Sequence, residues 1–331
     1  METRTEIVTA QISQPPVRRN RRIGLLVLKA IVAGVLMYFV LGMVDLRELS
    51  KSIQGADPLD IVIASSFLGL NLGTRALKWK MLLRTAGSTV STREAAKSIL
   101  LGITVGSFTP GQLGEVGGRY FAVPNGRLAH IVGLTMLDRT QVFLVLAMSG
   151  LTSYAFLILH PIALASSVSA ICIALCLFLY MRLDVIQKIA EKLPFRFIRR
   201  DWFSDFIETF SLLGSKELVQ SLFYSLAFNG VLFLQMFFFL NAFGSVDPWT
   251  AFVGFSAMMF FKSLLPISLG DIGVREASTV YFFSLLGVSN IVALSAALLM
   301  FAINVILPAL AGILFIPSAR FSQSAQAAPE K

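Results

Sequence analysis

The sequence predicts an all-α, polytopic helical membrane protein with about six full spans and two re-entrant segments of broken helix that form an inverted repeat. Of the 331 residues, 56% are hydrophobic and only 14% are charged, whereas a typical soluble domain is about 45–50% apolar and about 25% charged. The apolar stretches are continuous over roughly 20 residues, which favours helical spans over the alternating pattern of an outer-membrane barrel.

The first 22 residues contain five arginines and the pair Pro15-Pro16. This composition predicts a disordered, basic, cytoplasmic tail over residues 1–22. The apolar segment 23–44 that follows is longer than the roughly 7–15 residues of a signal-peptide core, so we expect it to be the first retained span.

Charge in the next two connections predicts the orientation. The loop 45–60 carries four acids and two bases, whereas residues 75–97 carry six bases and one acid. Because cytoplasmic loops of membrane proteins are enriched in Lys and Arg, the first loop is expected outside and the second inside, with a span at 59–77 between them. This rule, rather than nucleic-acid binding, accounts for the net charge of +9. Trp79 is expected to be an anchor at the membrane interface.

Residues 95–126 differ from an ordinary span because Gly and Pro interrupt their apolar pattern. Pro110 cannot donate a backbone hydrogen bond and clashes with the preceding turn of a helix. We therefore predict two half-helices joined inside the membrane, with Pro110 and Gly114 as hinge positions. Irregular backbone at that depth must be buried in protein or line a wet cavity.

The rest of the chain is expected to hold four further spans, one cytoplasmic segment and a second broken segment. The basic segment 182–216 is either an amphipathic helix on the membrane surface or a solvated connector. Residues 250–286 are interrupted at Pro266 and Gly270, and 317–331 form a polar C-terminal tail. The spans are residues 131–159, 161–181, 218–243 and 290–316.

An internal repeat links the two broken segments. Six residues between Ser107 and Arg119 recur unchanged 156 positions later, Glu115 recurs as Asp271, and Val116 recurs as Ile272. The shared pattern is S-x-x-P-x-x-L-G-[ED]-[VI]-G-x-R. By the charge rule the two copies enter from opposite sides, as in transporters that carry inverted repeats and broken helices near the midplane. One membrane domain, 23–316, is thus predicted to contain repeats at about 59–181 and 218–316, joined by 182–216.

The candidate site consists of the charged residues in and beside these copies. A charge at the centre of a bilayer costs roughly 2.5–3.5 kcal/mol, so such residues usually serve a purpose. They are Glu115, Arg119, Asp138, Arg139, Asp271, Arg275 and Glu276, with Gly270 and Gly273 as further hinge positions. Lys262 also lies next to the second copy.

Two interpretations of these charges remain open. Glu115 and Arg119, like Asp271 and Arg275, are four residues apart and could pair on one helix face. In one interpretation these pairs lock the broken helices in place. In the other, Arg119 and Arg275 bind an anionic group in a central cavity while the acids hold them or compete for them, because Arg is suited to bidentate recognition of phosphate.

Four stretches resemble the transmembrane region of the lysylphosphatidylglycerol synthase family, also called flippase-like membrane proteins. The stretches start at Arg75, Pro110, Asp138 and Pro266; the last, Pro-Ile-Ser-Leu-Gly-Asp-Ile-Gly-Val-Arg-Glu, is the most specific. The resemblance covers about 24–316, adds Arg75 to the substrate-binding candidates and includes Asp138 and Arg139. Asp271 stands where a Gly is more usual, so we expect an altered substrate preference or pH dependence.

The resemblance implies a multi-pass protein of a bacterial inner membrane, with cytoplasmic termini, that moves or binds a polar lipid. Expected partners are anionic or aminoacylated phospholipids or glycolipids. A 331-residue chain without a soluble synthase domain is not expected to transfer aminoacyl groups. No cofactor, metal or nucleic acid is expected, because the two His and two Cys form no metal-ligand cluster.

The leading hypothesis is therefore a flippase-like or scramblase-like lipid translocase. Three alternatives stay open: a small-solute secondary transporter, a non-catalytic partner of a lipid or glycolipid synthase, and an intramembrane lipid-modifying enzyme. The chain has no P-loop, so no built-in ATPase is expected. The sequence indicates neither the lipid nor the oligomeric state.

Overall fold

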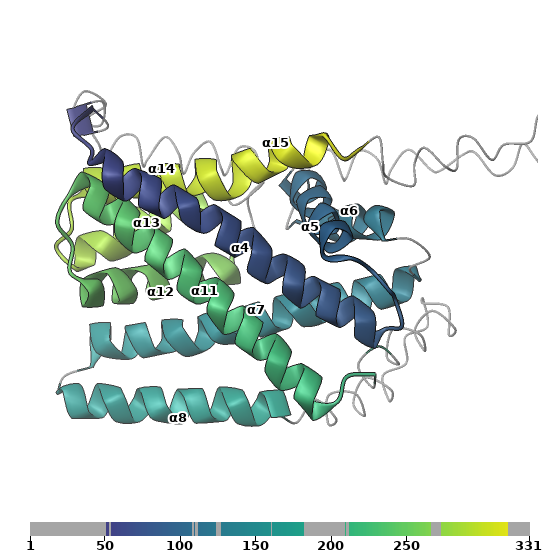
Figure 1. Cartoon of the computed structure of the whole chain (residues 1–331). Helices are drawn as coiled ribbons and strands as arrows, with labels where there is room; N and C mark the ends of the chain where they lie inside the picture. The colour runs from purple at the N-terminus through teal and green to yellow at the C-terminus, as the bar shows by residue number, and fades with distance from the viewer. Residues whose placement is uncertain are drawn as a thin grey trace, which may run out of the picture.

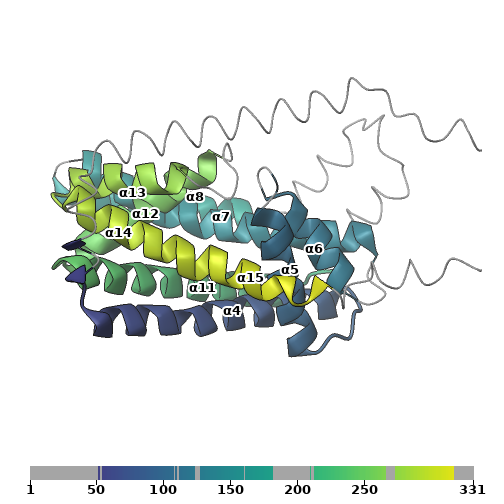
Figure 2. The same cartoon turned by 90° about the horizontal axis from the view of Figure 1, so that it is seen from above.

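The computed structural model describes residues 51–316 apart from 53, 108, 110–111, 124–126, 160, 182–208, 210–211 and 266–272. All regular elements in this part are helices, as predicted for a multi-pass helical membrane protein (Figures 1 and 2). The two tails, the span 23–44 and most of the segment 182–216 lie outside it. The helices are α4 (Pro58–Thr85), α5 (Thr92–Ser107), α6 (Gly114–Ala122), α7 (Leu128–Ile158), α8 (Ile162–Met181), α11 (Ser215–Phe243), α12 (Pro248–Leu264), α13 (Val274–Leu285), α14 (Asn290–Phe301) and α15 (Leu307–Ile313).

Three helical stretches of the described part are long and apolar enough to cross a membrane. They are Leu128–Ile158, Ser215–Phe243 and Asn290–Ile313, and a shorter apolar helix covers Ile162–Phe178. α4 has 28 residues but carries several charged and polar side chains, and it is not among the three. These stretches overlap four of the spans that hydropathy predicted, and Leu128–Ile158 and Ser215–Phe243 each begin three residues before the predicted start.

Two helices that start at the face expected outside begin with the same dipeptide, Asp-Pro. The carboxylate of Asp57 accepts a hydrogen bond from the backbone N–H of Leu59, and that of Asp247 accepts from Trp249 and Thr250. Asp is a favoured N-cap, and Pro fits the first helical turn because its missing N–H would have no partner there. The dipeptide therefore fixes where α4 and α12 start.

Both predicted breaks are present. α5 ends at Ser107 and α6 begins at Gly114, while α12 ends at Leu264 and α13 begins at Val274 after Gly273, which has φ +84°. Figures 1 and 2 place the α5–α6 pair and the α12–α13 pair toward opposite ends of the long helices. This is the arrangement that an inverted repeat requires, although Pro110, Pro266, Gly270 and Asp271 lie outside the described residues and the repeat stays a prediction.

Glycine allows the backbones of α5 and α6 to come into direct contact. A Cβ added to Gly118 would lie 2.4 Å from the carbonyl oxygen of Leu101, and one added to Gly114 would lie 2.6 Å from that of Val105. Both contacts are with backbone atoms, which cannot change rotamer to relieve an overlap as a side chain can. The backbones of α5 and α6 are therefore in direct contact, which places Glu115 and Arg119 of α6 against the bundle.

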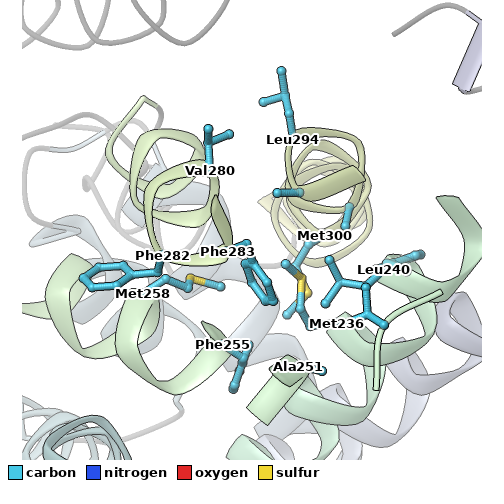
Figure 3. Close-up of a cluster of buried hydrophobic side chains, with 14 of the residues drawn as sticks. Met236, Leu240, Ala251, Phe255, Met258, Val280, Phe282, Phe283, Leu294 and Met300 are labelled. Atoms are coloured by element: carbon cyan, nitrogen blue, oxygen red, sulfur yellow. The ribbon is translucent and has the colours of Figure 1, made fainter. Parts of the chain in front are cut away.

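The largest apolar core lies between α11, α12, α13 and α14 (Figure 3). Phe283 of α13 is fully buried there and its ring lies against Gly254 of α12, at which a Cβ would come within 2.6 Å of the ring. Met258 and Met300 also belong to this core. Their thioether side chains are flexible and can fill an irregular space.

The last long helix contains a π-helical turn at Ala302–Ile306 between α14 and α15. The N–H of Leu307 donates to the carbonyl of Ala302, five residues earlier. Pro308 has no N–H to donate to the carbonyl of Asn304, which disfavours a regular α-helix at this point. Such turns are frequent at functional sites, and this one carries Asn304.

α4 is longer than the predicted span 59–77. No proline follows Pro58 within this helix, and a positive φ occurs only after its end, at Gly87 (+77°), so the helix continues to Thr85. Arg75, Lys78 and Trp79, expected in a cytoplasmic flank or at the interface, therefore lie within a continuous helix. Lys78 is 4% exposed and Trp79 is 1% exposed, so the interface-anchor role predicted for Trp79 is wrong.

The tight α5–α6 contact predicts the effect of a single added methyl group. We expect Gly118→Ala to destabilise the fold by about 1–3 kcal/mol, because its Cβ would overlap the Leu101 backbone. A thermal unfolding curve of the purified protein in detergent measures this as a lower Tm. Gly117→Ala is the matched control, because nothing lies within 4 Å of its Cβ position. Equal Tm values for the two variants would contradict the assignment.

Candidate functional site

A cavity of about 400 Å³ lies between the two broken segments and the long helices. Its wall combines apolar residues, such as Phe143, Leu146 and Phe228, with polar ones. The charged lining residues are Arg75 and Lys78 of α4, Glu115 and Arg119 of α6, Asp138 and Arg139 of α7, Lys262 of α12 and Arg275 of α13. The structure thus brings six of the eight predicted substrate-binding residues to one cavity.

Glu115 is the centre of the charge cluster. Its carboxylate lies 2.5 Å from Nη2 of Arg119 and 3.4 Å from Nη2 of Arg75, and it accepts hydrogen bonds from Nε and Nη2 of Arg139. The first of these is the i,i+4 pair that the spacing predicted. One carboxylate therefore connects three helices, α4, α6 and α7.

Asp138 is the second acid of the cluster. Its carboxylate oxygens lie 2.5 Å from Nζ of Lys78 and 2.9 Å from Nη2 of Arg119. Lys78 also donates to Oγ of Ser225 at 2.7 Å, which adds α11 to the cluster. Because Asp138 and Arg139 are adjacent on a helix, their side chains diverge, one toward Lys78 and the other toward Glu115.

The cluster lies well inside the membrane-spanning part. Arg75 is ten residues before the end of α4, and Asp138 and Ser225 are each ten residues after the starts of α7 and α11. At 1.5 Å per residue this is about 15 Å from the end that the charge rule places in the cytoplasm. These helices have 28–31 residues and are therefore about 42–47 Å long. A hydrocarbon core of about 30 Å centred on them would begin about 6–8 Å from that end, so the cluster lies inside the core, in its cytoplasmic half.

Arg119 has the contacts of a structural residue. It is 1% exposed, pairs with both acids, and its guanidinium carbon lies 4.5 Å from the centre of the Trp79 ring. Trp79 in turn donates to Ser98 at 3.0 Å, which holds the ring in place. These contacts fit the locking interpretation for Arg119, and its side chain also forms part of the cavity wall.

Arg275, the repeat partner of Arg119, reaches the same cavity from the other broken segment. It is 6% exposed, and its guanidinium carbon lies 5.0 Å from the centre of the Phe301 ring. Glu276 is not a lining residue: it is buried and accepts a hydrogen bond from the N–H of Gly273 at 2.8 Å, capping α13. Asp271 lies outside the described residues.

Polar lining residues that sequence reasoning left out of the predicted site include Lys78, Asn71 and Asn304. Lys78 could have been found, because it is three residues after Arg75 and so shares its helix face. Asn71 donates to Oδ1 of Asn304 at 2.9 Å, and Asn304 donates to Gln235 at 2.8 Å. That amide chain joins residues 233 positions apart, and no local sequence pattern predicts it.

Positive charge predominates in the cavity. The described lining residues include six cations and two carboxylates, an excess of four. Inclusion of Asp271 would still leave an excess of three. A cavity with this lining can hold a phosphate or another anion, and its apolar walls can accept an adjoining hydrocarbon chain.

The ion-pair cluster predicts a large penalty for losing Asp138. We expect Asp138→Asn to destabilise the fold by about 3–5 kcal/mol, because buried Lys78 and Arg119 would each lose a counter-ion. Thermal unfolding in detergent measures the effect. Asp60→Asn, in the first turn of α4, serves as control and should cost less than about 1 kcal/mol. A Tm for Asp138→Asn within error of the control would rule out this role.

Comparison with known proteins gives one clear match. A search among curated proteins finds no match. The family model described as "Lysylphosphatidylglycerol synthase TM region" matches residues 26–312. The match covers both broken segments and every residue that lines the cavity. The chain therefore belongs to the family of the lysylphosphatidylglycerol synthase transmembrane region.

Proposed function

We propose that this protein translocates a polar lipid across the membrane, with the lipid headgroup passing through the cavity between the two broken segments. The family relates the chain to lipid handling in a membrane. The observation that carries the proposal is the excess of cations in a cavity within the membrane-spanning part of the bundle.

The charge balance supports a ligand rather than scaffolding alone. Each charge placed at the bilayer centre costs roughly 2.5–3.5 kcal/mol. Ion pairs among the described lining residues leave a net positive charge, because this lining has three cations for each carboxylate. A lipid phosphate inside the cavity would offset part of that excess.

The lining also suits an amphipathic ligand. A volume of about 400 Å³ falls within the roughly 300–1,000 Å³ of small-molecule sites. Arg75 lies over the ring of Phe228, with 5.6 Å between the guanidinium carbon and the ring centre. Charged and apolar surfaces therefore meet in one wall, as a headgroup and the start of its acyl chain would require.

Glu115 provides a means by which the bound lipid headgroup can be released. Its carboxylate shares three arginines, and a phosphate offers the same oxygen acceptors to them. An incoming phosphate can take the place of Glu115 beside Arg75 and Arg139, and Glu115 can take its place again as the lipid leaves. Neither state leaves these arginines without an anion, so the headgroup is bound without being trapped.

Arg75 and Arg139, which are more exposed than Arg119, give the direct test. The side chains of Arg75 and Arg139 are 24% and 41% exposed, so their loss should affect folding less than loss of Arg119. In proteoliposomes with fluorescent phospholipids, we expect Arg75→Gln and Arg139→Gln to slow inner-to-outer transfer about 10-fold or more, since a charge-assisted hydrogen bond contributes about 1.5–3 kcal/mol.

Arg84→Gln and Arg127→Gln are the matched controls. Arg84 is an exposed residue near the end of α4, Arg127 is an exposed residue just before α7, and neither lines the cavity. Both should transfer lipid at the wild-type rate. Wild-type protein that moves no lipid faster than empty vesicles would exclude translocation, and lipid that emerges covalently altered would favour an enzyme instead.

A further inference from the structure

We infer that the cavity selects an anionic headgroup that carries hydroxyl groups and no amine, such as a phosphoglycerol or another phosphorylated polyol. This inference rests on the proposed function and narrows its substrate class. The observation behind it is a row of polar side chains along α4, in which two uncharged residues lie next to two cationic ones.

One face of α4 lines the cavity with four polar residues, Asn71, Thr74, Arg75 and Lys78. Their spacing of three, one and three residues keeps them on one side of the helix. Asn71 and Thr74 are uncharged, and Arg75 and Lys78 are cationic. One helical turn is about 5.4 Å, so the neutral pair lies about one turn from the cationic pair. A phosphate beside Arg75 would therefore have its headgroup substituent near Asn71 and Thr74.

The neutral pair presents hydrogen-bond acceptors. Asn71 is only 3% exposed, and among the described residues its Oδ1 has no hydrogen-bond partner. The amide chain fixes this orientation, because the NH₂ of Asn71 donates to Asn304 and that of Asn304 donates to Gln235 and to the Met300 carbonyl.

The hydroxyl of Thr74 donates to the backbone carbonyls of Leu70 and Asn71, which leaves its oxygen to accept. Two acceptors on one wall call for donors on the ligand. Among glycerophospholipid headgroups, the donors are the hydroxyl groups of a polyol and the ammonium of an amine.

The charge of the cavity decides between these donors. An ammonium group would enter a wall with an excess of four positive charges, and the two described carboxylates already take part in five ion pairs. Like charges at short range repel, and more strongly where water is scarce. A hydroxyl can donate to Asn71 and Thr74 without that repulsion, so the observations favour a polyol.

The first test compares headgroups on the wild-type protein. Proteoliposomes carry one of three acyl-labelled fluorescent lipids: phosphatidylglycerol, phosphatidic acid, which lacks the polyol, or phosphatidylethanolamine, which has an amine. Dithionite bleaching reports transfer. We expect phosphatidylglycerol to move about five- to tenfold faster than phosphatidic acid, the factor that one or two neutral hydrogen bonds provide, and phosphatidylethanolamine slowest of all. Phosphatidylethanolamine that moves as fast as phosphatidylglycerol overturns the inference.

The second test uses the neutral pair itself. Asn71→Leu and the milder Thr74→Val should slow phosphatidylglycerol toward the rate of phosphatidic acid and leave phosphatidic acid unchanged. Asn229→Leu is the matched control, because Asn229 is also a buried asparagine with an unpartnered Oδ1 in the described part of the chain but does not line the cavity. Equal slowing of both lipids by Thr74→Val would show a general defect and contradict the assignment.

A binding readout separates failure of this inference from failure of translocation. Short-chain phosphatidylglycerol or phosphatidylethanolamine is added to the detergent-purified full chain, and Tm is measured. If no lipid is translocated yet phosphatidylglycerol stabilises the protein more than phosphatidylethanolamine, translocation fails and the headgroup assignment stands. Equal stabilisation by the two lipids would refute the assignment even if both are translocated.

Discussion

The structure depends on keeping eight charged side chains inside a helical membrane domain. Glu115 and Asp138 are the only described acids in the cavity, and each receives cations from two or more helices. Removing charge from water is costly unless pairing and hydrogen bonding offset the loss. The close α5–α6 hairpin, the long α4 and the buried Trp79 all serve this requirement, because each brings one partner within reach of another.

The two broken segments contribute differently to the same cavity. In the first, Glu115 and Arg119 lie in ion pairs that fix α6 to α4 and α7. In the second, Arg275 reaches the cavity from α13, whereas Glu276 binds the backbone of its own helix terminus. The equivalent residues of the two copies, Arg119 and Arg275, thus reach one cavity from both segments, Arg119 over the Trp79 ring and Arg275 over the Phe301 ring.

Local patterns were sufficient to predict much of this fold. Apolar runs predicted the long helices, Pro and Gly predicted the breaks after Ser107 and Leu264, and the spacing of Glu115 and Arg119 predicted their pair. The charge rule misjudged Lys78, because it treats every base after an apolar run as a flanking one. The pairing of Asn71 with Asn304 could not be predicted, since it arises from packing of α4 against the far end of the chain.

The π-helical turn at Ala302–Ile306 lets the two ends of one long helix pack against different partner helices. α14 packs against α11 and α13, whereas α15 packs against α5, where a Cβ on Gly312 would come within 2.6 Å of the Leu100 carbonyl. One additional residue in a turn rotates everything beyond it by about 100° relative to a regular helix. Because of this change of phase, one continuous helix packs against both the half of the molecule that holds Arg275 and the half that holds Arg119.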